Sequence, residues 1–398
     1  MAVAPDRRVG QYWTRNGTAE ADALTRTRSA VDSVDYVRRI NAAFISARPV
    51  ARCTPPPMLE IAGIRLCGIC RQCFRWRCRR SGEDMLIRVP ENEFKPLVDR
   101  DKITADIKEH LGPWTSLLRD LVSYGSNLIP RCYSSSEKNL KDAVLLPILL
   151  RQAVAMLDGI ELLLTSGATH AANLQMRALF EASVYIDWIL LGDSERKAEY
   201  YYVHNLRRKR VWARRTQSGS PESQEFIAMM NKSGVPIDDK LREASKNELQ
   251  EIDRILSQPK FAVISNDIEK HRGGKRFDPP WYFPLGERSL LTMARTVDKT
   301  SQYVLLYSGA SEVMHVSNYG HHVRFRRGEV IFQPIRSVEG FENVFRFSTI
   351  NALLTFRRIL DQYRPGELPA FRRKYMEKWQ REFISFPQIT VKVETIRI

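Results

Sequence analysis

The first 84 residues of the chain contain no lysine. They hold fifteen arginines against eight acidic residues, and they carry five of the six cysteines of the whole chain. No apolar period runs through them, and such a composition is unlike that of a segment that builds its own core. We therefore expect residues 1–84 to be either a disordered basic extension or translated upstream sequence, with Met85 as the true start.

Four cysteines of this extension lie too close together for the usual structural zinc site. Cys67, Cys70, Cys73 and Cys78 fall within twelve positions, whereas structural zinc usually takes two CxxC-like pairs separated by enough chain to close a tetrahedron. An iron–sulfur run is tighter in pattern and is usually followed by proline. We predict no metal site and no cofactor. Cys132 is the only cysteine after residue 84, so we expect reduced thiols and a cytoplasmic location.

The sequence also lacks the motifs of the best-known reaction classes. No GxSxG, HExxH or phosphate-binding glycine loop occurs, which removes support for serine-esterase, zinc-protease and P-loop functions. No apolar run of the length of a signal peptide follows the early arginines, and we identify no other membrane-spanning segment, so no membrane contact is expected. The net charge of +16 favours an anionic partner instead.

Helical signals dominate the chain from Asp99 onward. The predicted fold class is mainly α: a multi-helix bundle with a small β hairpin or sheet near the C-terminus, in a single domain over residues 85–398. The first two helices are expected on either side of Gly112 and Pro113, and Pro130 should end the second. A third helix, over residues 137–167, should be capped by serines 134–136, bent at Pro147 and ended by Gly167.

The rest of the chain alternates further helices with irregular segments. Residues 271–287 are rich in Gly, Pro and aromatic residues, and such irregular segments are often functional. A hairpin is expected around Arg327 and Gly328, and the tail at 389–398 should add a third strand, since a lone hairpin is marginal in water. The expected helices cover residues 171–193, 194–215, 240–256, 289–317, 344–363 and 369–383.

The helix at residues 171–193 carries the most informative pair of charges, Arg177 and Glu181. Apolar side chains leave it almost no polar face, so it should be buried, and the pair should be carried inside with it. The cation precedes the anion by one turn, which is the weaker order for a pair on one helix, so each is expected to reach a neighbouring helix as well. A buried ion pair that fixes helix docking and a functional pocket both fit, and the structural interpretation is the commoner one.

The helix at residues 194–215 is rich in tyrosine and arginine. Basic side chains interleaved with aromatic rings suit single-stranded nucleic acid, because phosphates attract cations and unstacked bases pack on flat rings. The same pattern arises when tyrosines pack inward and arginines extend into water. The candidate nucleic-acid contacts are Tyr201, Arg207, Arg208, Arg210 and Arg214.

A line of polar side chains follows the helix expected at residues 289–317. Tyr303, Tyr307, Ser311 and His315 recur at four-residue steps, which places them on one face. His315 is a candidate general base, and two further histidines follow at positions 321 and 322. A core histidine hydrogen-bonded to tyrosine hydroxyls is the alternative.

From about Met85 onward the chain resembles an uncharacterised bacterial family known as domain of unknown function 5677. The resemblance rests on MRALFEASVYIDWIL, RKAEYYY and YSGASEVMHVSNYGHHVRF. It implies a mostly helical fold with no established activity. It also implies that Arg177, Glu181, Ser311 and His315 belong together.

Two functional hypotheses follow. The first is a binding protein for nucleic acid or another anionic partner, in a bacterial stress or defence context. The alternative is a hydrolase or nuclease, with His315 as acid and base, Arg177 stabilising developing negative charge and Glu181 orienting it. A looser similarity is to helical RNA-cutting proteins of bacterial conflict systems, which place a histidine four to six residues after an arginine. None of the seven histidines here follows an arginine at that spacing.

Overall fold

The computed structural model describes residues 97–219, 221–235, 237–315, 317–326 and 329–387. Within these residues the protein is mainly helical and contains one two-stranded antiparallel sheet, so the predicted fold class is confirmed. The basic extension at 1–84, with its closely spaced cysteines, and the strand predicted at 389–398 lie outside the described residues.

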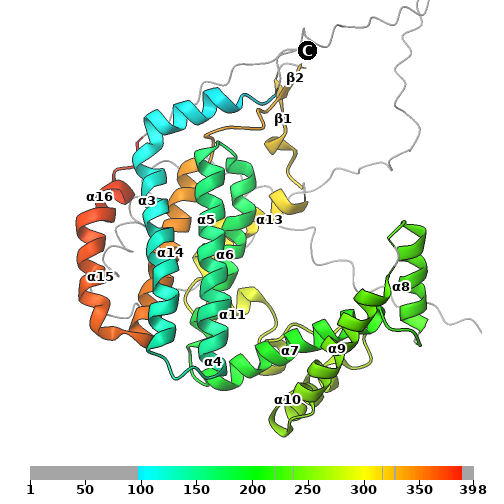
Figure 1. Cartoon of the computed structure of the whole chain (residues 1–398). Helices are drawn as coiled ribbons and strands as arrows, with labels where there is room; N and C mark the ends of the chain where they lie inside the picture. The colour runs from blue at the N-terminus through cyan, green and yellow to red at the C-terminus, as the bar shows by residue number, and fades with distance from the viewer. Residues whose placement is uncertain (1–96, 220, 236, 316, 327–328, 388–398) are drawn as a thin grey trace, which may run out of the picture. The chain divides into compact units, whose positions relative to one another are not determined.

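Four helices lie side by side and enclose the core (Figure 1). Helix α14 contacts the other three and buries aromatic side chains among them, including Phe345 and Phe356. Aromatic and aliphatic burial of this kind is the main source of stability in a helical bundle. The four helices are α3 (Arg100–Ser134), α5 (Arg151–Thr165), α6 (Thr169–Ile189) and α14 (Phe341–Tyr363).

Helix α3 runs without a break through Pro113 and Pro130, so the two separate helices predicted here were wrong. Proline removes one backbone donor and usually breaks a helix. The hydroxyl of Thr115 donates to the Gly112 carbonyl at 3.0 Å, beside Pro113. The buried leucines of α3 pack against α5 and α14, and this packing outweighs the local preference.

The next helical stretch absorbs its proline in a different way. It consists of α4 (Leu140–Ala143), the π-helical turn η2 (Val144–Leu150) and α5, and Pro147 lies within the π turn. A π turn shifts the hydrogen-bond pattern at the residue that cannot donate. The serines predicted to cap this stretch do not do so, because the side chain of Asn139 accepts from the Asp142 N–H instead. Gly167 follows the end of α5 with φ of +71°, as predicted.

The stretch Leu140–Thr165 is the one part of the described chain that is long and apolar enough to cross a membrane. No stretch that meets these criteria of length and composition was identified from the sequence. Half of its most apolar window is buried inside the protein, and its two main parts contact α3 and α6. A core helix meets the same criteria of length and composition.

Helix α7 (Ser194–Arg215) begins and ends where it was predicted. Its start is capped by the Asp193 side chain, which accepts from the Arg196 N–H. It contacts α8 (Pro221–Lys232), α9 (Asp239–Leu256) and α10 (Pro259–Arg272). Neither α8 nor α10 was predicted. Each begins with a proline, which is a favourable first helical residue as well as a helix breaker.

The helix predicted over residues 289–317 is interrupted. It consists of α11 (Leu290–Thr296), α12 (Thr300–Gln302), the π turn η4 (Tyr303–Tyr307) and α13 (Ser308–His315). Ser289 and Thr292 form a reciprocal cap at the start of α11. Asp298 then takes a φ of +57°, which turns the chain between α11 and α12.

The predicted hairpin is present as β1 (Val323–Arg326) and β2 (Glu329–Phe332), with Val323 opposite Phe332. After α14 the chain forms one more helical stretch, which packs on α3 and α14. Its parts are η6 (Pro365–Glu367), α15 (Leu368–Lys374), the π turn η7 (Tyr375–Trp379) and α16 (Gln380–Ile384). Short 3-10 turns occur at η3 (Phe283–Leu285) and η5 (Tyr319–His321).

Candidate functional site

Arg177 on α6 reaches across to η4 and α13. Its guanidinium donates to the Tyr307 hydroxyl at 2.8 Å and to Ser311 Oγ at 3.0 Å. The guanidinium carbon also lies 4.4 Å from the centre of the Tyr307 ring, which adds a cation–π contact. Arg177 thus contacts two members of the predicted polar line, Tyr307 and Ser311.

Glu181 lies one turn further along α6 and accepts from the Tyr185 hydroxyl at 3.0 Å. Arg177 is directed to η4 and α13, so the two charges do not neutralise each other as a local ion pair. Both side chains are partly exposed, whereas the sequence predicted that they would be carried inside. Arg177 makes the expected contact with a neighbouring element, while the hydrogen bond of Glu181 stays within its own helix.

The charge of Glu181 acts on three phenols. Burial, and then the Glu181 carboxylate, raise the pKa of Tyr185, of Tyr282 and of Tyr307 above their ordinary value. These hydroxyls therefore stay protonated at neutral pH; Tyr185 donates to Glu181, and Tyr307 accepts from Arg177. They cannot serve as bases there.

His315 ends α13 and is exposed. The contacts of Arg177 stop at Ser311 and at the sulfur of Met314, 3.6 Å away, one residue before His315. His321 and His322 pack against His170, with ring centres 5.1 and 5.5 Å away. Among the described contacts, therefore, no residue is positioned to exchange a proton with His315.

The arginines of α7 divide into inward and outward groups. Arg207 is only 12% exposed and donates to Asp278 at 2.7 and 2.9 Å and to Glu269 at 2.7 Å. Arg210 pairs with Asp253 at 2.6 Å. The Tyr201 ring packs edge-on against Trp281, with ring centres 5.3 Å apart. These three predicted nucleic-acid contacts are thus engaged within the protein.

Arg208 and Arg214, the two remaining candidates on α7, are exposed. Trp212 lies between them in sequence and is 58% exposed. These two arginines and this one ring are the part of the predicted basic and aromatic surface that faces outward.

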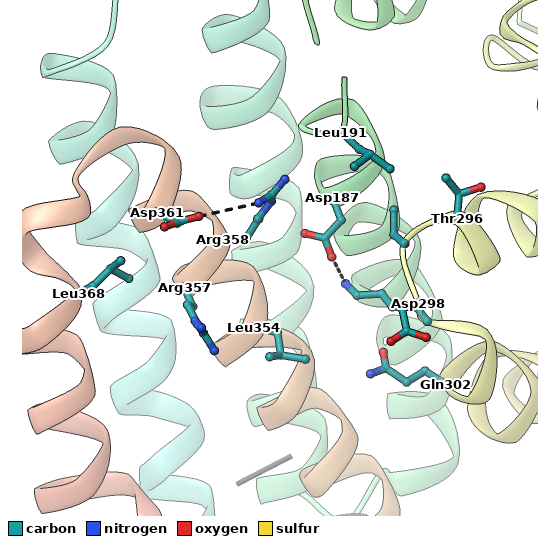
Figure 2. A pocket seen from close by; sticks show the side chains of 12 residues that line it. Asp187, Leu191, Thr296, Asp298, Gln302, Leu354, Arg357, Arg358, Asp361 and Leu368 are labelled. Carbon is teal, nitrogen blue, oxygen red and sulfur yellow. Dashed lines mark ion pairs between the residues drawn. The ribbon is translucent and has the colours of Figure 1, made fainter. Parts of the chain in front are cut away.

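A cavity of about 490 Å³ opens between α6, the turn after α11 and α14. In Figure 2, Asp187, Asp298 and Gln302 line one side, and Leu354, Arg357 and Asp361 line the other. Its complete lining is Asp187, Leu191, Thr296, Val297, Asp298, Lys299, Gln302, Leu354, Arg357, Arg358, Asp361 and Leu368. Polar and apolar side chains are mixed, as in sites that orient a small ligand.

Lys299 is the most deeply buried cation of this cavity. Its side chain is 5% exposed, and its ammonium lies 2.6 Å from the Asp187 carboxylate. It also donates to Ser183 Oγ at 3.1 Å. The single hydroxyl proton of Ser183 is shared between the Phe180 carbonyl at 2.8 Å and the side-chain oxygen of Asn351 at 3.2 Å. A buried cation held by one carboxylate and a chain of hydrogen bonds has a fixed position.

Three further side chains distinguish this cavity. Gln302 is 6% exposed, and its side-chain oxygen has no hydrogen-bond partner among the described residues. Arg358 donates to the Leu190 carbonyl at 3.1 Å and lies 3.8 Å from Asp361. Arg357 lies beside it on α14. An unsatisfied buried acceptor is costly unless something donates to it.

Residues 142–329 match the model of a family of unknown function, DUF5677. The match supports, over these residues, the family resemblance that the sequence motifs indicate. The DUF5677 segment includes Arg177, Glu181, Lys299 and Ser311, whereas Arg357 and Arg358 lie beyond it. No curated protein and no solved structure matches the chain. In the described part of the chain, no group of three or more His, Cys, Asp and Glu side chains has the arrangement of a metal site.

The cavity was not predicted from the sequence, because its central residue lies in an unexpected break between two helices. Lys299 sits just before α12, where a continuous helix was expected. One signal was available: Asp187 is an acidic residue in a largely apolar helix, and such a residue usually has a partner. Nothing in the sequence pointed to the Gln302 oxygen.

Proposed function

We propose that this protein binds a small organic oxyanion, a carboxylate or a phosphate, in the cavity around Lys299. The observation that carries the proposal is the buried ammonium of Lys299 in the cavity wall, 2.6 Å from a single carboxylate. An ammonium has three N–H groups. Asp187 and Ser183 accept two of them, which leaves one for a ligand oxygen.

The surroundings of Lys299 support an anionic ligand. Arg357 and Arg358 line the cavity opposite Lys299, and guanidinium groups suit the planar or tetrahedral oxygens of carboxylate and phosphate. The cavity volume of about 490 Å³ suits a small molecule and is far too small for a macromolecule.

Single-stranded nucleic acid is the second candidate for the anionic partner. Arg208 and Arg214 are exposed on α7, and the exposed Trp212 ring carries the Arg215 guanidinium 4.3 Å from its centre, which supports contact with phosphates and a base. The support is weaker than for the cavity, because Arg207 and Arg210 are neutralised by acidic residues of the same protein. Hydrolysis at His315 has less support still, since that side chain is exposed at the end of α13.

Thermal unfolding in the presence of small oxyanions tests the proposal. Inorganic phosphate, citrate and pyruvate at millimolar concentrations should each be compared with chloride at equal ionic strength. A ligand of the folded state raises the melting temperature by mass action. The rise should be lost in Arg357→Gln and kept in Arg381→Gln, a control whose side chain is 87% exposed on α16.

Two results would count against the cavity as the site. One is a melting temperature that no oxyanion changes. The other is a rise that is equal in both variants. A salt-sensitive shift caused by a single-stranded oligonucleotide, and removed by Arg208→Gln with Arg214→Gln, would support the second candidate instead.

A further inference from the structure

The cavity around Lys299 carries as many acidic as basic side chains. Its six charged lining residues are Asp187, Asp298, Asp361, Lys299, Arg357 and Arg358. Their formal charges cancel, so the wall as a whole carries no excess of positive charge. A ligand with a carboxylate alone meets acidic as well as basic groups there, whereas a ligand with both charges matches the wall.

Two of the three acids are already paired with cations of the same wall. The Asp187 carboxylate lies 2.6 Å from the Lys299 ammonium, and Asp361 lies 3.8 Å from Arg358. The third acid, Asp298, is exposed to solvent, and among the described residues its carboxylate forms no hydrogen bond or ion pair. Asp298 is therefore the acid of this wall that can accept from a cationic group of the ligand.

Backbone hydrogen bonds fix the turn that carries Asp298. The N–H of Asp298 donates to the Arg295 carbonyl at 3.3 Å, and the N–H of Lys299 donates to the Ala294 carbonyl at 2.7 Å. Asp298 has a left-handed φ of +57°, which aspartate and asparagine adopt more readily than most residues. An anion and a buried cation thus follow each other in sequence at a fixed place in the cavity wall.

Helix α14 forms the opposite wall of the cavity (Figure 2). It contributes the Arg357 guanidinium, a group that suits the planar oxygens of a carboxylate. The lining also contains four apolar side chains, Leu191, Val297, Leu354 and Leu368. The cavity therefore offers cations for a carboxylate, an anion for an ammonium and apolar surface for an aliphatic chain.

We propose that the ligand of this cavity is an α-amino acid with an aliphatic side chain. The inference rests on the proposed function, because the carboxylate of the amino acid is the oxyanion of that proposal. Asp298 adds recognition of the second charge, since its carboxylate accepts from the ammonium of the ligand in a charge-assisted hydrogen bond. The apolar lining covers the aliphatic side chain.

Calorimetric titration of the full chain with three related compounds tests the inference. L-Leucine carries both charges, 4-methylpentanoate lacks the ammonium, and 3-methylbutylamine lacks the carboxylate. All three share the same branched aliphatic chain, so they differ only in the charged groups. Leucine should bind at least about tenfold more tightly than either of the others, because it alone makes both charge-assisted contacts.

The variant Asp298→Asn tests recognition of the ammonium by itself. Asparagine tolerates the left-handed φ of this turn, so the fold should persist. The variant should bind leucine at least about tenfold more weakly than the wild type and bind 4-methylpentanoate no more weakly. Asp106→Asn makes the same chemical change at an exposed position of α3, outside the cavity lining, and should bind all three compounds like the wild type.

Equal affinity for leucine and 4-methylpentanoate would overturn the amino-acid inference while the oxyanion proposal stands. A folded Asp298→Asn protein that binds leucine like the wild type would overturn it as well. If helical circular dichroism shows that Asp298→Asn does not fold, the comparison of the three compounds on the wild type decides. Absence of binding by both carboxylates, together with a melting temperature that no oxyanion changes, would count against the inference and the proposed function alike.

Discussion

The Lys299 ammonium lies 2.6 Å from the Asp187 carboxylate and ties the turn before α12 to helix α6. Asp187 lies on a different face of α6 from Arg177 and Glu181, because the spacing between them does not match whole helical turns. One helix therefore carries two separate polar arrangements. The first borders the cavity, and the second faces the tyrosines of η4.

Removal of Lys299 alone should be strongly destabilising. Lys299→Met leaves the Asp187 side chain, which is 18% exposed, without its cation, and the loss of one partner of a buried pair costs about 3–5 kcal/mol. The double change Lys299→Met with Asp187→Leu should recover most of this loss, since no unpaired charge remains. Urea unfolding of the three proteins measures the effect. A single variant as stable as the wild type would show that the pair is not held in a low-dielectric setting.

Two adjacent arginines of α7 should differ sharply in their effect on stability. Arg207→Gln removes a guanidinium that pairs with Asp278, whose side chain is 12% exposed, and should cost about 3 kcal/mol or more. Arg208→Gln changes an exposed side chain and should stay within about 0.5 kcal/mol of the wild type. The free energies of unfolding in urea compare them directly. Similar values for both would contradict the inward role of Arg207.

Two glycines of α3 should respond in opposite directions to alanine. At Gly125 an added Cβ would lie 2.5 Å from Phe356 Cζ and 2.8 Å from Val154 Cγ2, so Gly125→Ala should cost about 1–3 kcal/mol. At Gly112 no atom lies within 4 Å of the added Cβ, and Gly112→Ala should stabilise the helix by about 0.5–1 kcal/mol. Thermal unfolding of the two variants distinguishes them. A stabilising Gly125→Ala would mean that α3 and α14 are not as closely packed as described.

Stability should fall as the pH is lowered through the titration of His170. Burial first, and then positive charge on His321 and His322, lower the pKa of His170 below its ordinary value of 6.5. Near and below that value the unfolded chain binds the proton more readily than the folded protein. The contribution of His170 to the free energy of unfolding is therefore complete above pH 6.5. It is lost as the pH falls through the pKa that His170 has in the folded protein.

His170→Gln should flatten this part of the pH dependence, and His110→Gln, at an exposed position of α3, should leave it unchanged. Unfolding by urea at a series of pH values is the measurement. An unchanged slope in His170→Gln would remove the histidine cluster as a source of acid sensitivity.

Local signals predicted the elements whose ends are fixed by a single side chain. Asp193 caps α7, and the predicted and observed bounds agree. Local signals failed at prolines, because a proline breaks a helix at some positions and begins one at others. Pro113 lies inside α3, where tertiary packing outweighs the missing donor, and Pro221 and Pro259 begin helices that were not predicted.

The candidate sites were predictable only in part. Four-residue spacing placed Tyr307 and Ser311 on one face, and a family resemblance linked Ser311 to Arg177, which the hydrogen bond at 3.0 Å now joins. The Lys299 cavity depends on a turn at Asp298 with a left-handed φ and on α14, which lies far along the chain. No local pattern encodes contacts between segments so distant in sequence.

Calorimetric titration of oxyanions into the wild type and into the Lys299→Met, Asp187→Leu double variant tests the central claim most directly. The double variant leaves no unpaired charge in the cavity wall, so its fold should persist while its buried cation is gone. We predict that the wild type binds phosphate, citrate or pyruvate and that the folded double variant binds the same anion at least about tenfold more weakly. Equal affinity in the two proteins, or no binding of any oxyanion by the wild type, would contradict the account.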